Sequence, residues 1–295
     1  MADRRLGRAT VLTGDRGGKY PHGNSLLVCG TEETLVVDPS LSLLARRAEL
    51  PRVDRVVNSH CHEDHVAGNH LFPDVPWHLH EADVMGIHSL DGLMAIYGFD
   101  AGTDGAFRKV VVEQFHFTPR ADALPFADGD VFELGRTRVR VLHAPGHTRG
   151  HCVLLVEPEG VLYLGDIDLS SFGPYYGDAW SSLEDFERTL ARVREIDVPH
   201  YATFHHVGVV DGRAAFLERL DRFAAVIADR EARLLAFLAE PRTMDDVAAH
   251  RFVYRPADPV PYADPVERRS MGQHVARLVR AGAVREVEPG RFVTT

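Results

Sequence analysis

Three histidines and two acids stand within six consecutive residues, His60 to His65, in the order His-Cys-His-Glu-Asp-His. Imidazole nitrogens and carboxylate oxygens are the ligands with which proteins bind zinc and similar divalent ions. One ion cannot comfortably take all its ligands from so short a stretch, so we expect two adjacent ions and further ligands elsewhere, including a bridging carboxylate. The ligand-type residues of the stretch are His60, His62, Asp64 and His65.

Later segments offer the missing ligands at the ends of strand-like runs. His147 follows one such run and a Pro-Gly turn, Asp166 ends another after a glycine, and the pair His205 and His206 ends a third. Ligands held on several strand ends are typical of a rigid, preorganised site. Cys61 lies between two of the histidines, where alternation turns it away from the metals. We expect it to be a packed thiol, with thiolate ligation as the less favoured alternative.

Four segments resemble the metallo-beta-lactamase superfamily, in particular its glyoxalase II-like and beta-lactamase-like group. They are NSHCHEDHVAG, HAPGHTRGHC, YLGDIDL and, more weakly, TFHHVG. Upstream, HGNSLLV and LVVDPS are similar to the first strands of that family, so the resemblance spans roughly residues 9 to 225. These motifs are specific for fold and metal, and they do not specify a substrate.

The resemblance implies a role for each ligand. His60, His62 and His147 would hold the first metal, and Asp64, His65 and one of His205 or His206 would hold the second. Asp166 would bridge the two. His205 is preferred because it directly follows its strand, although the family usually has a glycine right after this histidine. Two divalent ions are implied, with zinc favoured and iron or manganese as alternatives. Asp38 would support the site from beneath.

The elements that position these residues mix hairpins with helices, which indicates an α/β (α+β) fold in which helices cover sheets. The resemblance makes this the αββα four-layer sandwich. The predicted strands are residues 25–29, 34–37, 53–57, 110–112, 139–142, 152–156 and 161–164. The predicted helices of this region are residues 80–97 and 183–196, the second with Ser181 or Ser182 as its N-cap.

The last part of the chain changes character. Residues 214–238 predict a long helix, Thr243 and Asp246 predict the capped start of a short one, and residues 265–281 predict another. Residues 282–294 then read as a hairpin. This order resembles a winged-helix module, so we expect a catalytic domain over residues 1–228 and a winged-helix-like module over residues 229–295.

The composition and charge of the chain argue against several classes of protein. The 295 residues carry a formal net charge of −10, which argues against a broad nucleic-acid surface. The N-terminus has no apolar signal-like segment, no run is long enough to span a bilayer, and the three scattered cysteines make no disulfide framework. We expect a cytoplasmic enzyme.

The predicted activity is hydrolysis by a hydroxide bound between two metals, with Asp64 orienting it and carrying its proton. Binding to metal lowers the pKa of water from 15.7 to about 7. The favoured substrate is a small-molecule thioester, ester or lactone. Alternatives are an endoribonuclease of the same superfamily and a non-enzymatic metal- and DNA-binding regulator. Residues 255–295 carry seven arginines and five acids, a small surplus for RNA binding.

Two segments are candidates for the walls of a substrate pocket. The aromatic loop after Asp166 supplies Phe172, Tyr175 and Tyr176 as candidate substrate-lining residues. The insertion between Met85 and Phe117 is the second candidate wall.

Overall fold

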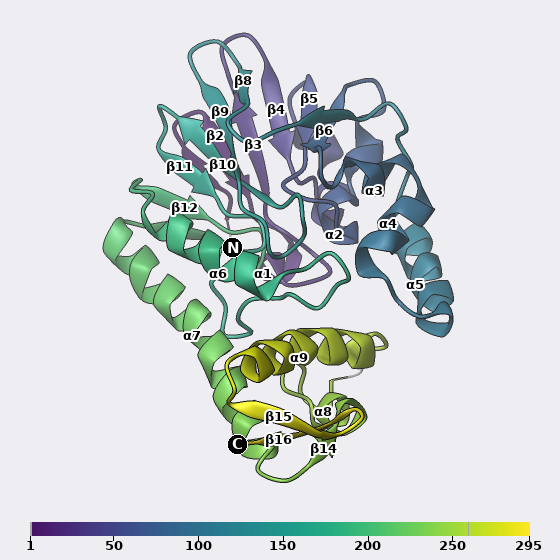
Figure 1. The fold of residues 1–295 in the computed structure, drawn as a ribbon. Coiled ribbons are helices and arrows are strands. Elements are labelled where there is room, and N and C mark those ends of the chain that lie inside the picture. The colour runs from purple at the N-terminus through teal and green to yellow at the C-terminus, as the bar shows by residue number, and fades with distance from the viewer. Residues whose placement is uncertain (1, 259) are drawn as a thin grey trace.

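Two β-sheets lie face to face in the computed structural model, which describes residues 2–258 and 260–295 (Figure 1). The first sheet holds its strands in chain order, and the second has the order β13-β12-β11-β10-β9-β8. The first comprises β1 Arg4–Leu6, β2 Ala9–Leu12, β3 Ser25–Cys29, β4 Thr34–Val37, β5 Arg55–Val57, β6 Trp77–His80 and β7 Leu124–Phe126. The second comprises β8 Val131–Glu133, β9 Arg138–His143, β10 Cys152–Glu157, β11 Val161–Tyr163, β12 His200–Ala202 and β13 Val209–Asp211.

Helices cover the outer face of each sheet (Figure 1). The helices are α1 Asp15–Gly18, α2 Glu63–Val66, α3 Val84–His88, α4 Leu90–Tyr97, α5 Ala101–Glu113, α6 Leu183–Arg194, α7 Arg213–Phe237, α8 Met244–His250 and α9 Ala263–Arg280, with 3-10 turns at Leu41–Leu43, Arg47–Glu49 and Asn69–Leu71. Helices α3 to α5 pack on the first sheet, and α6 and α7 pack on the second. The predicted four-layer αββα architecture is thereby confirmed.

Strand alternation explains how the layers hold together. Leu26 and Val28 of β3 point into the core between the two sheets, whereas Leu27 between them points outward to the helices. In β11, Val161 likewise faces the inter-sheet core and Leu162 faces α6 and α7. Because successive side chains in a strand face opposite sides, an unbroken apolar run here serves two cores at once.

Two element predictions were wrong. Residues 110–112, predicted as a strand, lie in α5, which starts where the Asp100 side chain accepts hydrogen bonds from two backbone N–H groups. Val111 is fully buried and Val112 is 46% exposed, because an amphipathic helix buries only one face. The helix predicted over residues 80–97 is interrupted, since His80 ends β6 and the extended Ser89 separates α3 from α4 and caps α4.

The C-terminal part forms a smaller unit with its own core, below the sheets in Figure 1. It contains α8, α9 and a three-stranded sheet of β14 Arg242–Thr243, β16 Arg291–Thr294 and β15 Val284–Glu288, in that order. Thr243 and Asp246 form the expected capping box. We call residues 242–295 the C-terminal module; its kinship with winged-helix modules stays a prediction.

Helix α7 joins the two parts. It runs without interruption through the predicted domain boundary at residue 228. Phe216 and Phe223 of its first half pack on the second sheet, whereas Leu234 and Leu235 near its end belong to the core of the C-terminal module. Among the described residues, no helix is both long and apolar enough to cross a membrane.

Candidate metal centre

Loops that leave strand ends bring the predicted ligands to one place. The loop after β5 carries His60 and His62 and runs into the short helix α2, which carries Asp64 and His65. Asp166 follows β11 through Gly165, whose φ is +53° and whose position leaves no room for a Cβ, because that atom would lie 2.6 Å from His151 Nε2. The tight turn at this glycine aims the carboxylate at the histidines.

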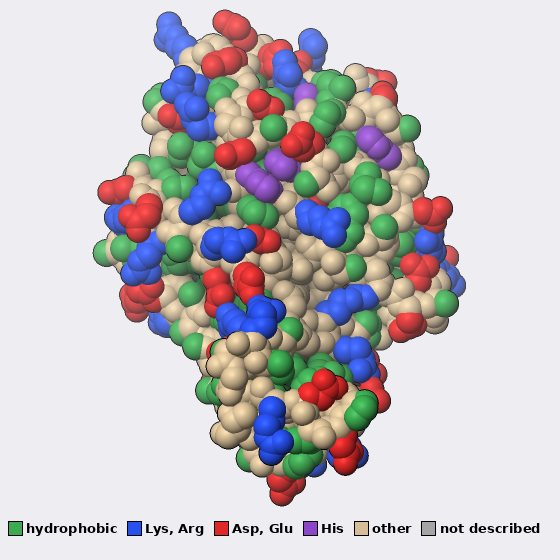
Figure 2. All heavy atoms as spheres, in the orientation of Figure 1, with side chains coloured by type: hydrophobic (Ala, Val, Ile, Leu, Met, Phe, Trp, Pro, Cys, Tyr) green, Lys and Arg blue, Asp and Glu red, His purple; other side chains and the backbone are tan. Residues whose placement is uncertain are grey.

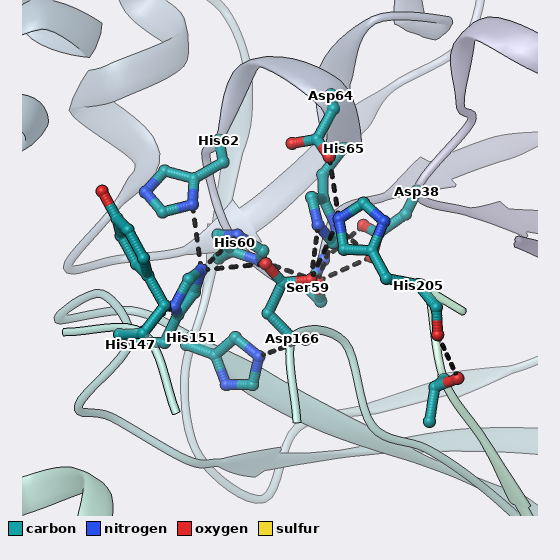
Figure 3. Close-up of polar contacts among 12 residues, drawn as sticks. Asp38, Ser59, His60, His62, Asp64, His65, His147, His151, Asp166 and His205 are labelled. Atoms are coloured by element: carbon teal, nitrogen blue, oxygen red, sulfur yellow. Dashed lines mark hydrogen bonds and ion pairs between the residues drawn. The ribbon is translucent and has the colours of Figure 1, made fainter. Parts of the chain in front are cut away.

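The first group gathers around His147 Nε2 (Figure 3). This atom lies 3.2 Å from His60 Nε2, 2.9 Å from His62 Nδ1 and 3.1 Å from Asp166 Oδ2. The four ligand atoms lie within 4.8 Å of one another. Several lone-pair donors that converge on one point, buried from water, are suited to hold a cation between them.

The second group lies on the other side of Asp166 (Figure 3). It consists of Asp64, His65 and His205, whose ligand atoms also lie within 4.8 Å of one another. Asp166 Oδ1 lies 2.9 Å from His65 Nε2 and 3.7 Å from His205 Nε2, while its Oδ2 faces the first group. One carboxylate therefore faces both groups, as a bridging ligand of a binuclear site must.

Each histidine is held through the ring nitrogen that faces away from its group. Ligating histidines characteristically have such an outer partner, which fixes the tautomer and the ring orientation. The partners are Ser59 Oγ for His60 (3.0 Å), Asp178 Oδ2 for His62 (2.9 Å), Asp38 Oδ2 for His65 (2.8 Å), the Tyr175 carbonyl for His147 (3.0 Å) and the Gly18 carbonyl for His205 (3.0 Å). This pattern leaves one free nitrogen per ring, directed into the site.

The electrostatics favour an ionised Asp166. Burial alone would raise its pKa, but His65, His205 and His147 surround it and hold the pKa well below its ordinary value. Burial and the neighbouring histidines also lower the pKa of His60 well below its usual range, so that ring stays neutral. An ionised carboxylate and a neutral imidazole are the forms that bind metals.

The sequence left two questions open: whether His205 or His206 is the last ligand, and whether Cys61 is a ligand or a packed thiol. His205 lies in the second group, whereas His206 does not; the φ of His206 is +55° and its exposed side chain lines the neighbouring cavity. The geometry therefore favours His205 as the ligand. Cys61 is fully buried in the core behind the loop, and burial raises the pKa of its thiol well above the ordinary value. It packs as a thiol, as expected.

A cavity of about 810 Å³ opens from the two groups. Phe172 and Tyr175 line it as expected, and Tyr97, Phe99 and Phe107 from the segment after Met85 form another wall. Tyr176 does not line it, contrary to the prediction. Its ring is fully buried against the second sheet, and its hydroxyl lies 2.9 Å from His274 Nε2.

Other residues of the site carried no signal in the sequence. Asp178 lies outside every motif, and Tyr254 and Tyr262 of the C-terminal module reach the cavity from far along the chain. Glu63 did stand in the His-rich stretch. Its buried carboxylate accepts a hydrogen bond from Tyr20 at 2.8 Å and another from Tyr97, so it joins two cavity walls instead of facing the ligand groups.

Residues 20–223 match the sequence profile of the Metallo-beta-lactamase superfamily. The chain belongs to this superfamily. Among its relatives is a hydroxyacylglutathione hydrolase of Methylococcus capsulatus, 27% identical over 241 residues that cover 78% of this chain and 80% of the relative. An acyl-coenzyme A thioesterase of Homo sapiens is 27% identical over 208 residues, which cover 60% of this chain and 70% of the relative. Family and relatives agree with the predicted class of enzyme, a hydrolase.

Solved structures extend the likeness to the whole chain. A metallo-beta-lactamase family protein from Thermus thermophilus superimposes with a TM-score of 0.73 at 25% identity, covering 98% of this chain and 99% of that one. A beta-lactamase domain protein from Burkholderia ambifaria gives a TM-score of 0.70 at 19% identity, with 99% and 93% covered. Coverage this high includes the C-terminal module, so the module belongs to a shared fold.

Proposed function

We propose that this protein is a metal-dependent hydrolase of small-molecule thioesters. The observation that carries the proposal is the pair of ligand groups that share Asp166, with every imidazole fixed from outside, at the floor of a cavity of about 810 Å³. Two divalent ions, zinc first among the candidates, would be held by His60, His62, His147, Asp64, His65, His205 and the shared Asp166. When bound, such ions supply Lewis acidity and a nucleophilic water at neutral pH.

The protein's own side chains supply positioning and proton transfer. Asp64 borders the cavity, and its Oδ2 lies 3.0 Å from His205 Nε2. We assign it the role of orienting the attacking water and accepting its proton. The aromatic walls exclude bulk water from the acyl carbon, which strengthens electrostatic interactions there.

The cavity lining offers cations to a substrate with an anionic carrier. Besides the acids of the ligand groups and Glu63, its charged residues are Lys19, Arg222, Arg230, Arg233, Arg255, Asp168, Asp229 and Asp258. Thiol carriers with carboxylates or phosphates would meet cations here. The relatives named for glutathione and coenzyme A thioesters support the same choice. Esters and lactones remain candidate substrates because the same attack cleaves them.

The ribonuclease alternative is not favoured by the C-terminal arginines. Four of the seven form ion pairs within the molecule: Arg268 with Asp245, Arg277 with Glu187 and Glu231, Arg280 with Glu184 and Arg291 with Glu288. On the face drawn in Figure 2, Lys and Arg side chains alternate with Asp and Glu and form no continuous basic surface. The regulator alternative is not favoured either, because the two groups offer all the residues that the proposed hydrolysis would need.

The test is a substrate panel with zinc-loaded protein. Initial rates would be measured on acyl-glutathione and acyl-coenzyme A thioesters, an aryl ester, a lactone, a chromogenic beta-lactam and a single-stranded RNA. Asp64→Ala protein, purified in the same way, reports contaminating activity. We expect thioester turnover that the variant lacks. Turnover of RNA alone, or equal rates with both proteins, would overturn the proposal.

A further inference from the structure

A second pocket adjoins the metal cavity, between α5 and the loop that precedes α9. Its volume is about 490 Å³. Gly102, Thr103, Ala106, Phe107, Val110 and Gln114 form its α5 side, and the spacing of these residues places most of them along one face of the helix. Val260, Pro261 and Tyr262 close it from the C-terminal module.

The two pockets share one wall. Tyr20, Phe107, Val260 and Tyr262 line both of them. The rings of Phe107 and Tyr262 pack edge to face in this wall, with centroids 5.4 Å apart. A molecule seated over the ligand groups would therefore have to reach the second pocket around the edge of the wall.

The chemistry of the two pockets differs. Acids, histidines and cations line the metal cavity, whereas the described lining of the second pocket contains no Lys, Arg, Asp, Glu or His. Its polar groups are the side chains of Thr103 and Gln114 and two tyrosine hydroxyls, one of which, that of Tyr20, already donates a hydrogen bond to Glu63. An uncharged pocket next to a charged one selects the apolar part of a substrate.

We propose that the second pocket binds the hydrocarbon chain of the acyl group, so that the preferred substrates are thioesters of medium or long apolar acyl groups. This rests on the proposed function. The thioester carbonyl would lie at the ligand groups, the chain would pass the edge of the wall formed by Phe107 and Tyr262, and the anionic carrier would lie toward Arg222 and Arg233.

The decisive comparison uses two tryptophan substitutions on α5. Ala106→Trp adds a large ring at an exposed position that lines the second pocket, whereas Val112→Trp adds the same ring at an exposed position of the same helix outside the pocket. The measured quantity is the ratio of kcat/KM for octanoyl over acetyl thioesters of one carrier. Burial of each methylene favours binding by about fourfold. We expect the wild-type ratio to exceed about tenfold, to fall toward one in Ala106→Trp and to persist in Val112→Trp.

A binding measurement separates this inference from the proposed function. S-octylglutathione and S-methylglutathione are thioethers that cannot be hydrolysed, and their Kd values can be compared by calorimetry. If no thioester is turned over, the proposed hydrolysis fails, and the Kd ratio in the two variants still tests the pocket. If the octyl compound binds no more tightly than the methyl compound, or Ala106→Trp leaves the preference intact, the inference is wrong.

Discussion

The floor and the far wall of the same cavity are built in different ways. The floor consists of short side chains on loops that leave strands, and each imidazole is fixed by a second partner. The wall contributed by the C-terminal module is an irregular segment, of which residues 252–258 and 260–262 are described, anchored by Glu267 and by contacts of α9 with the catalytic part. The floor is therefore preorganised, whereas the position of the wall depends on how a separate unit packs against the catalytic part.

Substitution of a candidate metal ligand at the floor of the cavity should have the largest effect on activity. Asp166→Ala removes the carboxylate whose two oxygens face the two ligand groups. We expect thioesterase activity to fall at least about 10³-fold, because the bridging ligand is needed to hold both ions that activate water. Elemental analysis should show fewer metal ions per chain. Asp229→Ala, an exposed cavity acid outside the groups, is the control and should keep its metal. Full activity in Asp166→Ala would exclude the binuclear mechanism.

A smaller effect on metal affinity and activity is expected for a residue that contacts a ligand histidine from outside the groups. Asp178 Oδ2 lies 2.9 Å from His62 Nε2; although burial disfavours a charged ring, this carboxylate helps raise the pKa of His62 to about 9 in the metal-free protein. Asp178→Asn should weaken metal affinity or activity about 10- to 100-fold, as substitutions of outer partners typically do. A competition titration with a chelator measures this. Unchanged affinity would mean that His62 needs no carboxylate to orient it.

The candidate metal ligands at the floor of the cavity could be predicted from the sequence, whereas the residues of the wall from the C-terminal module could not. The reason is that local sequence marks the first set and only tertiary packing brings in the second. His60 to His65 and the strand-end residues Asp166 and His205 are recognisable because residue type and local spacing define the chemistry. Tyr254 and Tyr262 meet the cavity only through packing of α9 on α4, α6 and α7, and nothing local marks them. Residues 110–112 were predicted as a strand because three β-branched residues dominate them, but burial of one helical face overrides that preference.

A substitution that weakens the anchor of the wall segment should change KM more than kcat. Glu267 is fully buried, and its carboxylate accepts hydrogen bonds from the backbone N–H groups of Phe252, Val253 and Tyr254 at 2.7 to 2.9 Å. In Glu267→Gln one oxygen becomes a donor, so part of this anchor is lost at a cost of about 1–3 kcal/mol. We expect KM for long-chain thioesters to rise severalfold while kcat stays nearly constant.

The control for this variant is Glu288→Gln, an exposed acid in the same module. It should leave both constants unchanged. A fall in kcat with constant KM in Glu267→Gln would show that the wall contributes to the reaction at the metal site, and the contrast between floor and wall would then fail.

The smallest effect concerns how the module is held to the rest of the protein. His274 of α9 is fully buried, with Tyr176 of the catalytic part at its Nε2 and Glu231 of α7 at its Nδ1; Arg277 and Arg230 also face it. Burial lowers its pKa to about 4, although Glu231 opposes the shift. The unfolded chain, with an ordinary histidine pKa of about 6.5, therefore binds more protons than the folded protein between these values.

Stability should consequently rise with pH in this range and be lost as pH falls from about 6.5 toward about 4. The His274 contribution between about pH 6.5 and 5 is about 1–2 kcal/mol. Chemical unfolding at both pH values should give a smaller pH-dependent loss for His274→Gln than for wild type, and the comparison cancels the other titrating groups. Equal losses would mean that the ring is protonated in the folded protein, paired with Glu231, and that the module is held by an ion pair instead of a neutral hydrogen bond.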